Sequence, residues 1–489
     1  MKKYILAIDE GTTSERVVLY DTEINKIVDY HGTKITQFYP HESWVEHDAN
    51  EIWTDVKSSM DTLIKKHKLT VDDIIGIGIT NQRETTVAWN KANGLPINRA
   101  IVWQCKRTAG YCDNLPKTLK DKIKDKTGLV VDSYFSATKM KWILDNVSGA
   151  KKLAQAGNLA MGTVDSFLIY KLTNGKSFAT DTTNASRTML VNLAEPMKYD
   201  EELLNYFKIP ASALPEIKNS ADNYGMAKTI IGDIPILSVI GDQQSSLVGQ
   251  GCLETGKAKM TYGTGGFLLV NSGTTLNKNN KFTLNTVAYT IKNQTTYAIE
   301  GSIFTVGSTL EYLKNTLSLF SSYSEIDSIC EKASSNSVYF LPAFTGLGSP
   351  YWSSTAKAGV FGLTLGTTKE DIVKSAIESF ALILSDIARY LNSIGIKIKN
   401  LTTDGGVSKC NYLLEFQSAI LGVPVSRMTE TESTSLGAIF LAGLQAGVYK
   451  NIKEIEKLVK PATTFTPRAT KMRAKPRIEE WDNFIHKML

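Results

Sequence analysis

Two short turns rich in glycine and threonine have the composition of a phosphate-binding site. The first is Asp9-Glu10-Gly11-Thr12-Thr13-Ser14, and the second is Tyr262-Gly263-Thr264-Gly265-Gly266. A tight turn of this kind directs several backbone N–H groups and hydroxyls into one concavity, which binds anions. Asp9 adds a carboxylate oxygen, a ligand type that Mg²⁺ prefers. The pair predicts two loops that close on one polyphosphate, although each turn alone also has the composition of an ordinary hairpin.

A further candidate, Asp242, follows the apolar run 234–240 at the end of a predicted strand. A strand end holds a carboxylate rigidly, and an aspartate there can accept the proton of an alcohol. Phosphoryl transfer needs mainly positioning, charge compensation and such a base. Asp242 is therefore predicted as the catalytic base, with a turn or helix cap as the alternative. The five histidines lie outside these motifs, which argues against histidine-based catalysis.

Arg83 and Glu84 come soon after another predicted strand, 74–79. Vicinal hydroxyls both donate and accept hydrogen bonds, so a guanidinium beside a carboxylate suits a polyol. Trp103 or Phe267 would cover the carbon chain of that polyol. A surface ion pair is the alternative interpretation of the Arg-Glu dipeptide.

A third glycine element, Asp404-Gly405-Gly406, joins a short predicted strand to a helix that begins near Cys410. The N–H groups at the start of such a helix can face a nucleotide. Three glycine turns in one chain indicate an actin-like fold in which two related domains grip the nucleotide.

Two α/β halves are expected to position these groups, because 489 residues exceed the size at which a single core stops growing. The first half mixes strand and helix patterns, and the second half begins the same scheme again. The expected strands are 4–8, 16–20, 74–79, 86–89, 257–261 and 267–271, and the expected helices are 49–66, 139–146, 369–391, 410–421 and 435–446. Flexible residues at 249–251 place the boundary between domains 1–248 and 249–489.

Composition excludes several other classes of protein. Hydrophobic residues make up 42% and charged residues 21%, as in ordinary folded domains. The apolar run 4–8 is too short for a signal peptide and no run could span a bilayer, so we expect a cytoplasmic protein without membrane insertion. The net charge of +6 equals the charge of segment 460–478 alone, so nucleic-acid binding is not expected.

The sequence resembles the FGGY carbohydrate kinases over nearly its whole length. The resemblance is carried by Trp44-Val45-Glu46-His47, 81–86, Trp103-Gln104-Cys105, 134–142, Asn184-Ala185-Ser186-Arg187-Thr188-Met189, 342–348 and 358–378. It implies two duplicated ribonuclease H-like, actin-like ATPase domains with a nucleotide cleft between them. It also implies ATP and Mg²⁺ as cofactors and transfer of the γ-phosphoryl group to glycerol, giving sn-glycerol 3-phosphate. Family members of this kind form homodimers or homotetramers, which we expect here as well.

The same resemblance implies a role for individual residues. Those expected to bind glycerol are Arg83, Glu84, Trp103, Tyr134, Asp242, Gln243 and Phe267, with Asp242 as base and with Asp9 and Asp242 near the metal. Those expected around the nucleotide are Thr12, Thr13, Ser14, Arg16, Thr264, Gly307, Gly406 and Cys410. A kinase for another polyol or ketose remains an alternative, as does an actin-like nucleotide-binding module without catalysis.

Two residues of the first turn depart from the family's usual pattern. Glu10 stands where glutamine is frequent, and Glu15 stands where a small residue is usual. Two additional carboxylates beside a triphosphate would repel it, each by on the order of 1 kcal/mol at an effective dielectric constant of about 20. The sequence therefore predicts a weakened affinity for ATP. Glu311 and Cys410, near the expected adenosine, also differ from the usual glutamine and asparagine.

Overall fold

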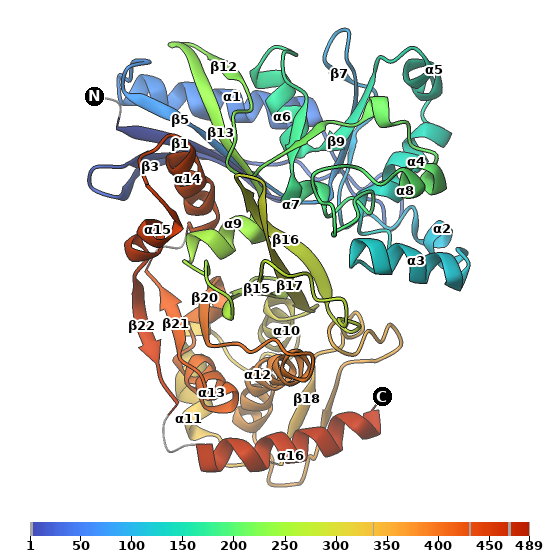
Figure 1. The fold of residues 1–489 in the computed structure, drawn as a ribbon. Helices are drawn as coiled ribbons and strands as arrows, with labels where there is room; N and C mark the ends of the chain where they lie inside the picture. The colour runs from blue at the N-terminus through green and yellow to red at the C-terminus, as the bar shows by residue number, and fades with distance from the viewer. Residues whose placement is uncertain (1–2, 336, 430–431, 468–470, 489) are drawn as a thin grey trace.

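Two β-sheets, one from each half of the chain, form the framework of the molecule (Figure 1), a computed structural model that describes residues 3–335, 337–429, 432–467 and 471–488. In spatial order the first sheet consists of β12 (Met226–Thr229), β13 (Gly232–Gly241), β5 (Ile74–Asn81), β1 (Tyr4–Glu10), β2 (Ser14–Asp21) and β3 (Lys26–Lys34). The second sheet consists of β16 (Leu284–Ile291), β17 (Gln294–Ile303), β15 (Gly266–Gly273), β14 (Lys257–Tyr262), β20 (Asn400–Asp404), β21 (Val425–Met428) and β22 (Pro461–Phe465).

The pairing of the strands repeats from one sheet to the other. The β1–β2 hairpin is antiparallel, and β1 continues in parallel to β5 and then β13. The β14–β15 hairpin is likewise antiparallel, and β14 continues in parallel to β20 and then β21. An antiparallel strand, β12 or β22, closes the parallel side of each sheet. The predicted duplicated, ribonuclease H-like α/β architecture is confirmed, and both glycine-threonine turns join the strands of hairpins.

Helices cover the sheets, and those predicted from periodicity are all present. In the first half they are α1 (Ala49–Lys66), α2 (Ala109–Asp113), α3 (Lys117–Thr127), α4 (Ser136–Asn146), α5 (Ala150–Gln155), α6 (Val164–Leu172), α7 (Thr182–Ala185), α8 (Glu201–Phe207) and α9 (Asp242–Gly249). In the second half they are α10 (Gly307–Glu311), α11 (Ile326–Lys332), α12 (Lys369–Ser393), α13 (Asn411–Leu421), α14 (Ser433–Gln445), α15 (Ile452–Leu458) and α16 (Lys471–Met488). Asp48 caps the start of α1, and Gly422, at φ +69°, ends α13.

Smaller elements complete each half. A third sheet in the first half contains β4 (Glu46–His47), β6 (Thr86–Asn90), β7 (Leu95–Pro96), β8 (Ala100–Ile101) and β9 (Leu159–Thr163), and two-stranded ladders join β10 (Ala179–Asp181) to β11 (Glu216–Lys218) and β18 (Tyr339–Leu341) to β19 (Gly359–Phe361). Within the described ranges, none of the helices is long and apolar enough to cross a bilayer. Of the basic segment 460–478, Arg468 lies outside the described residues, whereas Arg477 in α16 is buried against Glu378 of α12.

Two helices tie the halves together by packing across them. α14, although late in the chain, lies on the first sheet beside β1 and β5 (Figure 1), where its Ala438 carbonyl accepts a hydrogen bond from Ser238 of β13. α9 makes the reciprocal contact, because its Gln244 donates to the carbonyl of Val287 in β16. The two helices touch at Gly437, where a Cβ atom would lie 1.9 Å from the carbonyl oxygen of Ser245. Only glycine permits this approach, which brings the strand ends of both sheets to one place.

Candidate active site

The carboxyl ends of the parallel strands in the first sheet bring Asp9 and Asp242 to one edge. Asp9 lies at the end of β1 and Asp242 directly follows β13. Burial raises the pKa of Asp9 to about 7, and its carboxylate accepts a hydrogen bond of 3.0 Å from Ser435 of α14. Burial also raises the pKa of Asp242, whose Oδ1 lies 3.3 Å from Nε of Arg83. The sequence predicted that each carboxylate follows a strand, and the structure brings these two strand ends to one edge.

The donor set at this edge suits a magnesium ion carried by a nucleotide. No cluster of three or more His, Cys, Asp or Glu side chains with metal-binding geometry occurs among the described residues. Mg²⁺ in phosphoryl-transfer sites is commonly held by one or two carboxylates together with phosphate oxygens and water. The burial that raises the pKa of Asp9 shows that this carboxylate lacks sufficient countercharge, which a cation would supply.

Two glutamine side chains bind the backbone carbonyl groups of the first turn. Gln37 donates to the carbonyl of Thr12 at 2.8 Å, and Gln82 donates to the carbonyl of Gly11 at 2.9 Å. Both glutamines contact the buried ring of His47, which orients them. The two carbonyls are therefore engaged by the protein, while Thr13 is exposed on the turn. The arrangement has the polarity that an anion requires.

The neighbouring predicted residues lie around this first turn. Ser14 closes the turn, since its carbonyl accepts from the N–H of Gly11 at 3.0 Å. The Thr12 hydroxyl accepts a hydrogen bond of 2.9 Å from the indole of Trp103. Arg16 forms an ion pair with Glu432, just before α14. The turn is thus connected both to the expected polyol residues and to the second half of the chain.

The second turn is assembled against two other predicted glycines. Thr264 is exposed at its tip, and its neighbour Gly263 accepts a hydrogen bond of 3.0 Å from the N–H of Gly307. A Cβ atom on Gly307 would lie 2.6 Å from that carbonyl oxygen. Gly405, at φ +86°, lies against the backbone of Tyr262, while Gly406 beside it faces open space. Glycine backbone therefore lies beside the exposed Thr264 on this side of the site, so a ligand can approach it closely.

Cys410, the last residue predicted on the nucleotide side, has a structural role. It caps the start of α13, its side chain is buried, and its thiol donates to the carboxylate of Asp327. Burial raises the pKa of this thiol to about 12. Its side chain is therefore engaged by the protein, and a role in nucleotide binding remains a prediction.

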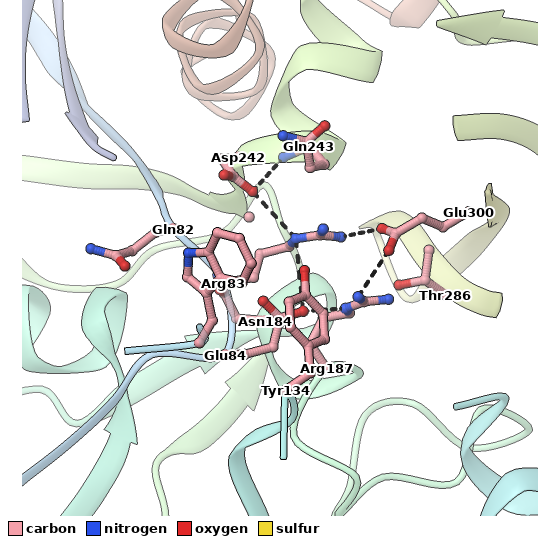
Figure 2. Close-up of polar contacts among 12 residues, drawn as sticks. Gln82, Arg83, Glu84, Tyr134, Asn184, Arg187, Asp242, Gln243, Thr286 and Glu300 are labelled. Atoms are coloured by element: carbon pink, nitrogen blue, oxygen red, sulfur yellow. Dashed lines mark hydrogen bonds and ion pairs between the residues drawn. The ribbon is translucent and has the colours of Figure 1, made fainter. Parts of the chain in front are cut away.

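Arg83, Glu84, Tyr134 and Gln243, all predicted to bind a polyol, lie beside Asp242 (Figure 2). Arg83 and Glu84 are 3% and 1% exposed, and Glu84 adopts the left-handed conformation at φ +60°, which costs a non-glycine residue free energy. The ring of Tyr134 lies edge-on to that of Trp103, with centroids 5.3 Å apart. The strained backbone conformation of Glu84 is retained because its surroundings impose it, as they do at binding sites.

Two side chains without a predicted role complete this group. Arg187 follows α7 and Glu300 lies in β17, and both are buried. Arg187 binds Glu84 through Nε at 2.5 Å and Glu300 through Nη2 at 3.0 Å, while Nη1 of Arg83 reaches the other oxygen of Glu300 at 2.6 Å. Burial pushes the pKa of Glu300 upward, but Arg187 and Arg83 outweigh it and lower that pKa to about 2. The carboxylate is therefore ionised between two guanidinium groups.

Comparison with known proteins agrees with this geometry. The family model for the N-terminal domain of the FGGY family of carbohydrate kinases matches residues 4–249, and that for the C-terminal domain matches residues 258–446. The chain belongs to the FGGY family of carbohydrate kinases. As an FGGY kinase it is a transferase, and its fold is the duplicated one that the sequence predicted.

Individual relatives indicate which FGGY kinases this chain is similar to. A glycerol kinase of Fusobacterium nucleatum subsp. nucleatum is 45% identical over 488 residues, which cover 98% of this chain and 97% of the relative. The crystal structure of Plasmodium falciparum glycerol kinase with ADP superposes with a TM-score of 0.93 at 34% identity, covering 99% and 98% of the two chains. Ligand-bound xylulose kinase from Lactobacillus acidophilus, at 23% identity and a TM-score of 0.86 over 99% and 98%, shares the fold.

This FGGY kinase also contains a buried lysine that the sequence did not single out. Lys259 of β14 is fully buried, and its ammonium group donates to Oε1 of Gln243 and to the Thr261 hydroxyl. Burial lowers its pKa to about 8, against the attraction of Asp404 and Asp242. The strand contains two lysines, Lys257 and Lys259, and nothing in the sequence indicates that Lys259 is the one that is fully buried. Lys259 adds positive charge beside Asp242 and fixes the amide of Gln243.

The two extra carboxylates of the first turn are not open to a ligand. Glu10 is 0% exposed, and burial raises its pKa well above the ordinary range. Glu15 is 1% exposed and accepts hydrogen bonds from Thr33 and Ser59. The predicted repulsion presumed two solvent-facing charges, and the burial of both side chains removes that premise.

Proposed function

We propose that this FGGY kinase transfers the γ-phosphoryl group of ATP to a terminal hydroxyl of glycerol, giving sn-glycerol 3-phosphate and ADP. The observation that supports the proposal most directly is the juxtaposition of Arg83 and Asp242, 3.3 Å apart, at the strand edge that also carries Asp9. A guanidinium that positions an alcohol beside a carboxylate able to take its proton is the minimal set for phosphorylating a hydroxyl.

The polar atoms left free in the site suit a small triol. Nε and Nη1 of Arg83 are engaged by Asp242 and Glu300, and one oxygen of Glu84 is engaged by Arg187. Among the described residues, Nη2 of Arg83 and the second oxygen of Glu84 have no partner. One donor and one acceptor remain for adjacent hydroxyls of the substrate, and the rings of Trp103 and Tyr134 would cover its carbons.

In the proposed reaction Asp242 accepts the proton of the terminal hydroxyl as the alcohol oxygen attacks the γ-phosphorus. The bond from oxygen to the γ-phosphorus forms while the bond between the γ-phosphorus and the β–γ bridging oxygen breaks, and ADP leaves in line. Its raised pKa makes Asp242 a stronger base than an exposed aspartate. Bound at Asp9 and Asp242, Mg²⁺ would neutralise charge on the β- and γ-phosphates. Arg83 and Lys259 supply further positive charge nearby.

The nucleotide is proposed to lie between the two turns. Thr12, Thr13, Ser14 and Arg16 would contact its phosphates from one side and Thr264 from the other, while Gly307 and Gly406 would let its adenosine approach the backbone. The Plasmodium falciparum glycerol kinase was crystallised with ADP, which supports a nucleotide on this fold.

An ADP-release assay with glycerol, xylulose, ribulose and erythritol tests the proposal. Glycerol should give the highest kcat/KM, and Asp242→Asn should lower kcat by about 10²- to 10⁴-fold with little change in the KM for ATP. Asp145→Asn removes an aspartate of a surface ion pair on α4 and serves as the control with unchanged kinetics. A preference for a ketose would support the alternative substrate, and ATP turnover that ignores every acceptor and survives Asp242→Asn would indicate a nucleotide-binding module.

A further inference from the structure

Four buried charges form a closed ring beneath the proposed polyol site (Figure 2). Arg83 binds Glu300, Glu300 binds Arg187, Arg187 binds Glu84, and Nε of Arg83 lies 4.0 Å from Oε1 of Glu84. None of the four residues is more than 3% exposed. A buried ion pair rarely adds net stability compared with apolar side chains of the same size, because the desolvation of both charges opposes their attraction. Stability alone therefore gives little reason for the ring.

We propose that Arg187 and Glu300 are positioning residues that set the substrate affinity of this kinase by holding Glu84 and Arg83 for the acceptor alcohol. The proposal rests on the proposed function, since it concerns the same alcohol. Neither residue needs to touch the substrate. Each acts by occupying one side of a substrate-binding group, so that the other side is presented in a fixed direction.

The geometry of Glu84 supports this role. Its backbone is strained at φ +60°, and Arg187 holds one carboxylate oxygen at 2.5 Å. The Ser136 hydroxyl donates to the carbonyl of Glu84 at 3.0 Å and fixes the backbone as well. A strained residue persists only when its surroundings impose the conformation. Without Arg187 the carboxylate would be free to rotate, and its burial would favour the neutral acid, which Glu84's raised pKa already indicates.

Glu300 has the corresponding effect on Arg83. It binds Nη1 at 2.6 Å, and Gln244 accepts from the same nitrogen at 3.2 Å. Together with Asp242 at Nε, these contacts determine the plane of the guanidinium and leave Nη2 for the substrate. A lysine in place of Arg83 could not satisfy three directions at once, because only the guanidinium has donors in a rigid planar arrangement.

The ring also joins the two halves of the molecule. Arg83 and Glu84 follow β5 of the first sheet, and Arg187 follows α7, whereas Glu300 belongs to β17 of the second sheet. The polyol site in the first half is thus complete only when the second half is docked against it. A change in the position of β17 would alter the affinity for the acceptor through Glu300, without contact between β17 and the substrate.

Two conservative variants test the proposal. Glu300→Gln removes one negative charge, and Arg187→Lys keeps the positive charge but loses the planar guanidinium that binds two carboxylates. We expect each variant to raise the KM for glycerol about 10- to 100-fold. The KM for ATP should change less than about threefold, and the fold decrease in kcat should be smaller than the fold increase in the KM for glycerol. Glu300→Asp should recover part of the affinity that Glu300→Gln loses. The shift of the melting temperature by glycerol should shrink in parallel, which provides a readout that does not require turnover.

A second buried arginine–glutamate pair provides the matched control. Arg477 donates to Glu378 at 2.8 Å in the core of the second half, away from the ring. Glu378→Gln should lower the melting temperature as much as Glu300→Gln but leave the glycerol KM unchanged. This comparison separates the loss of a buried ion pair from the loss of positioning.

Several outcomes would overturn the proposal. Folded Glu300→Gln and Arg187→Lys proteins with a wild-type glycerol KM would do so, and so would equal increases in the KM for glycerol and for ATP, which indicate general damage. If Glu300→Gln fails to fold, Arg187→Lys and Glu300→Asp decide the question. If the wild-type protein prefers another acceptor, the proposed function fails while the same KM comparison with that acceptor still decides the role of the ring. If it accepts no alcohol, both proposals fail.

Discussion

The proposed active site has two sides, a polyol side and a phosphate side, that are built from different materials. The polyol side consists of buried charged side chains, Arg83, Glu84, Arg187 and Glu300, each fixed by at least two others. The phosphate side consists of backbone turns, glycines and exposed threonines such as Thr13 and Thr264. A backbone-lined cradle accepts any polyphosphate, whereas fixed donors and acceptors reject an alcohol whose hydroxyls do not match. Discrimination between acceptor alcohols is therefore expected mainly from the polyol side, whose charged groups are rigidly paired.

The largest effect should come from breaking the polyol side at its centre. Arg83→Met removes the residue that contacts Asp242, Glu300 and Gln244 and leaves Glu300 without one of its partners. Breaking a buried charge pair in this way costs about 3–5 kcal/mol. Because this pair positions the proposed acceptor site, kcat/KM for glycerol should fall by up to the same free energy, roughly 10²- to 10⁴-fold. Binding of ADP, measured by calorimetry, should stay within about threefold of the wild type. A parallel loss of ADP binding would show that the two sides are not separate.

The same contrast explains how much of the site could be predicted. The turns, the strand ends and Asp242 could be recognised because local sequence patterns determine them. A short apolar run was enough to locate each strand and the residue that follows it. The ring could not be predicted, because Arg83 and Glu300 are 217 positions apart and Glu84 and Arg187 are 103 positions apart. Arg187 lay inside a motif of small polar residues and Glu300 inside an apolar strand. A charged residue among small or apolar neighbours indicates a buried charge, but it does not indicate which residue pairs with that charge.

Burial was the other quantity that the sequence did not supply. Counting charges in the first turn predicted repulsion by Glu10 and Glu15, yet both carboxyl groups are buried, and each accepts hydrogen bonds through one oxygen, from Gln82 and from Ser59 respectively. The pattern around Cys410 correctly predicted a loop leading into α13, but not that Asp327 binds its thiol. Helix and strand bounds follow from periodicity along the chain, whereas the direction of a polar side chain depends on tertiary packing.

A smaller effect is expected from breaking the phosphate side. In Gly307→Ala the new methyl group would lie 2.6 Å from the Gly263 carbonyl oxygen, which forces α10 away from the second turn. The KM for ATP should rise about 10- to 100-fold, with the glycerol KM at saturating ATP unchanged. Gly110→Ala places a methyl group in open space in α2 and should leave both constants as they are. A rise in the glycerol KM alone in Gly307→Ala would contradict the proposed division of the site.

The network beneath the first turn should make stability depend on pH. His47 is buried between Gln37 and Gln82, and burial lowers its pKa from 6.5 to about 4. The unfolded chain takes up a proton near pH 6.5 and the folded chain only near pH 4, so stability is complete above pH 6.5 and is lost as the pH falls. The loss contributed by His47 between pH 7 and pH 5 should be about 2 kcal/mol, while buried carboxyl groups with a raised pKa, such as Asp165, contribute in the opposite direction.

Denaturant unfolding of the wild type and of His47→Gln at pH 5, 6 and 7 measures this effect. The variant lacks the titrating ring, so the difference in unfolding free energy between the two proteins should shrink as the pH falls. Asp165, whose pKa burial raises to about 7 and which binds Thr163 and Thr180, titrates in both proteins and therefore cancels in the comparison. A difference that is constant across this pH range would contradict the neutral, buried state of His47.

The smallest expected effect concerns one hydrogen bond between the two sides. The indole N–H of Trp103, whose ring lies in the polyol site, donates to the Thr12 hydroxyl of the first phosphate turn at 2.9 Å. Trp103→Phe keeps an aromatic ring and removes this bond, which is worth about 1 kcal/mol. If the bond couples the sites, glycerol should tighten the binding of ADP about fivefold less in the variant than in the wild type, and ADP should tighten glycerol binding by the same reduced factor. Trp352→Phe, which loses a bond to the carbonyl of Phe282, is the control. Equal coupling in Trp103→Phe and the wild type would show that the polyol side and the phosphate side are joined through Arg83 and Asp242 instead.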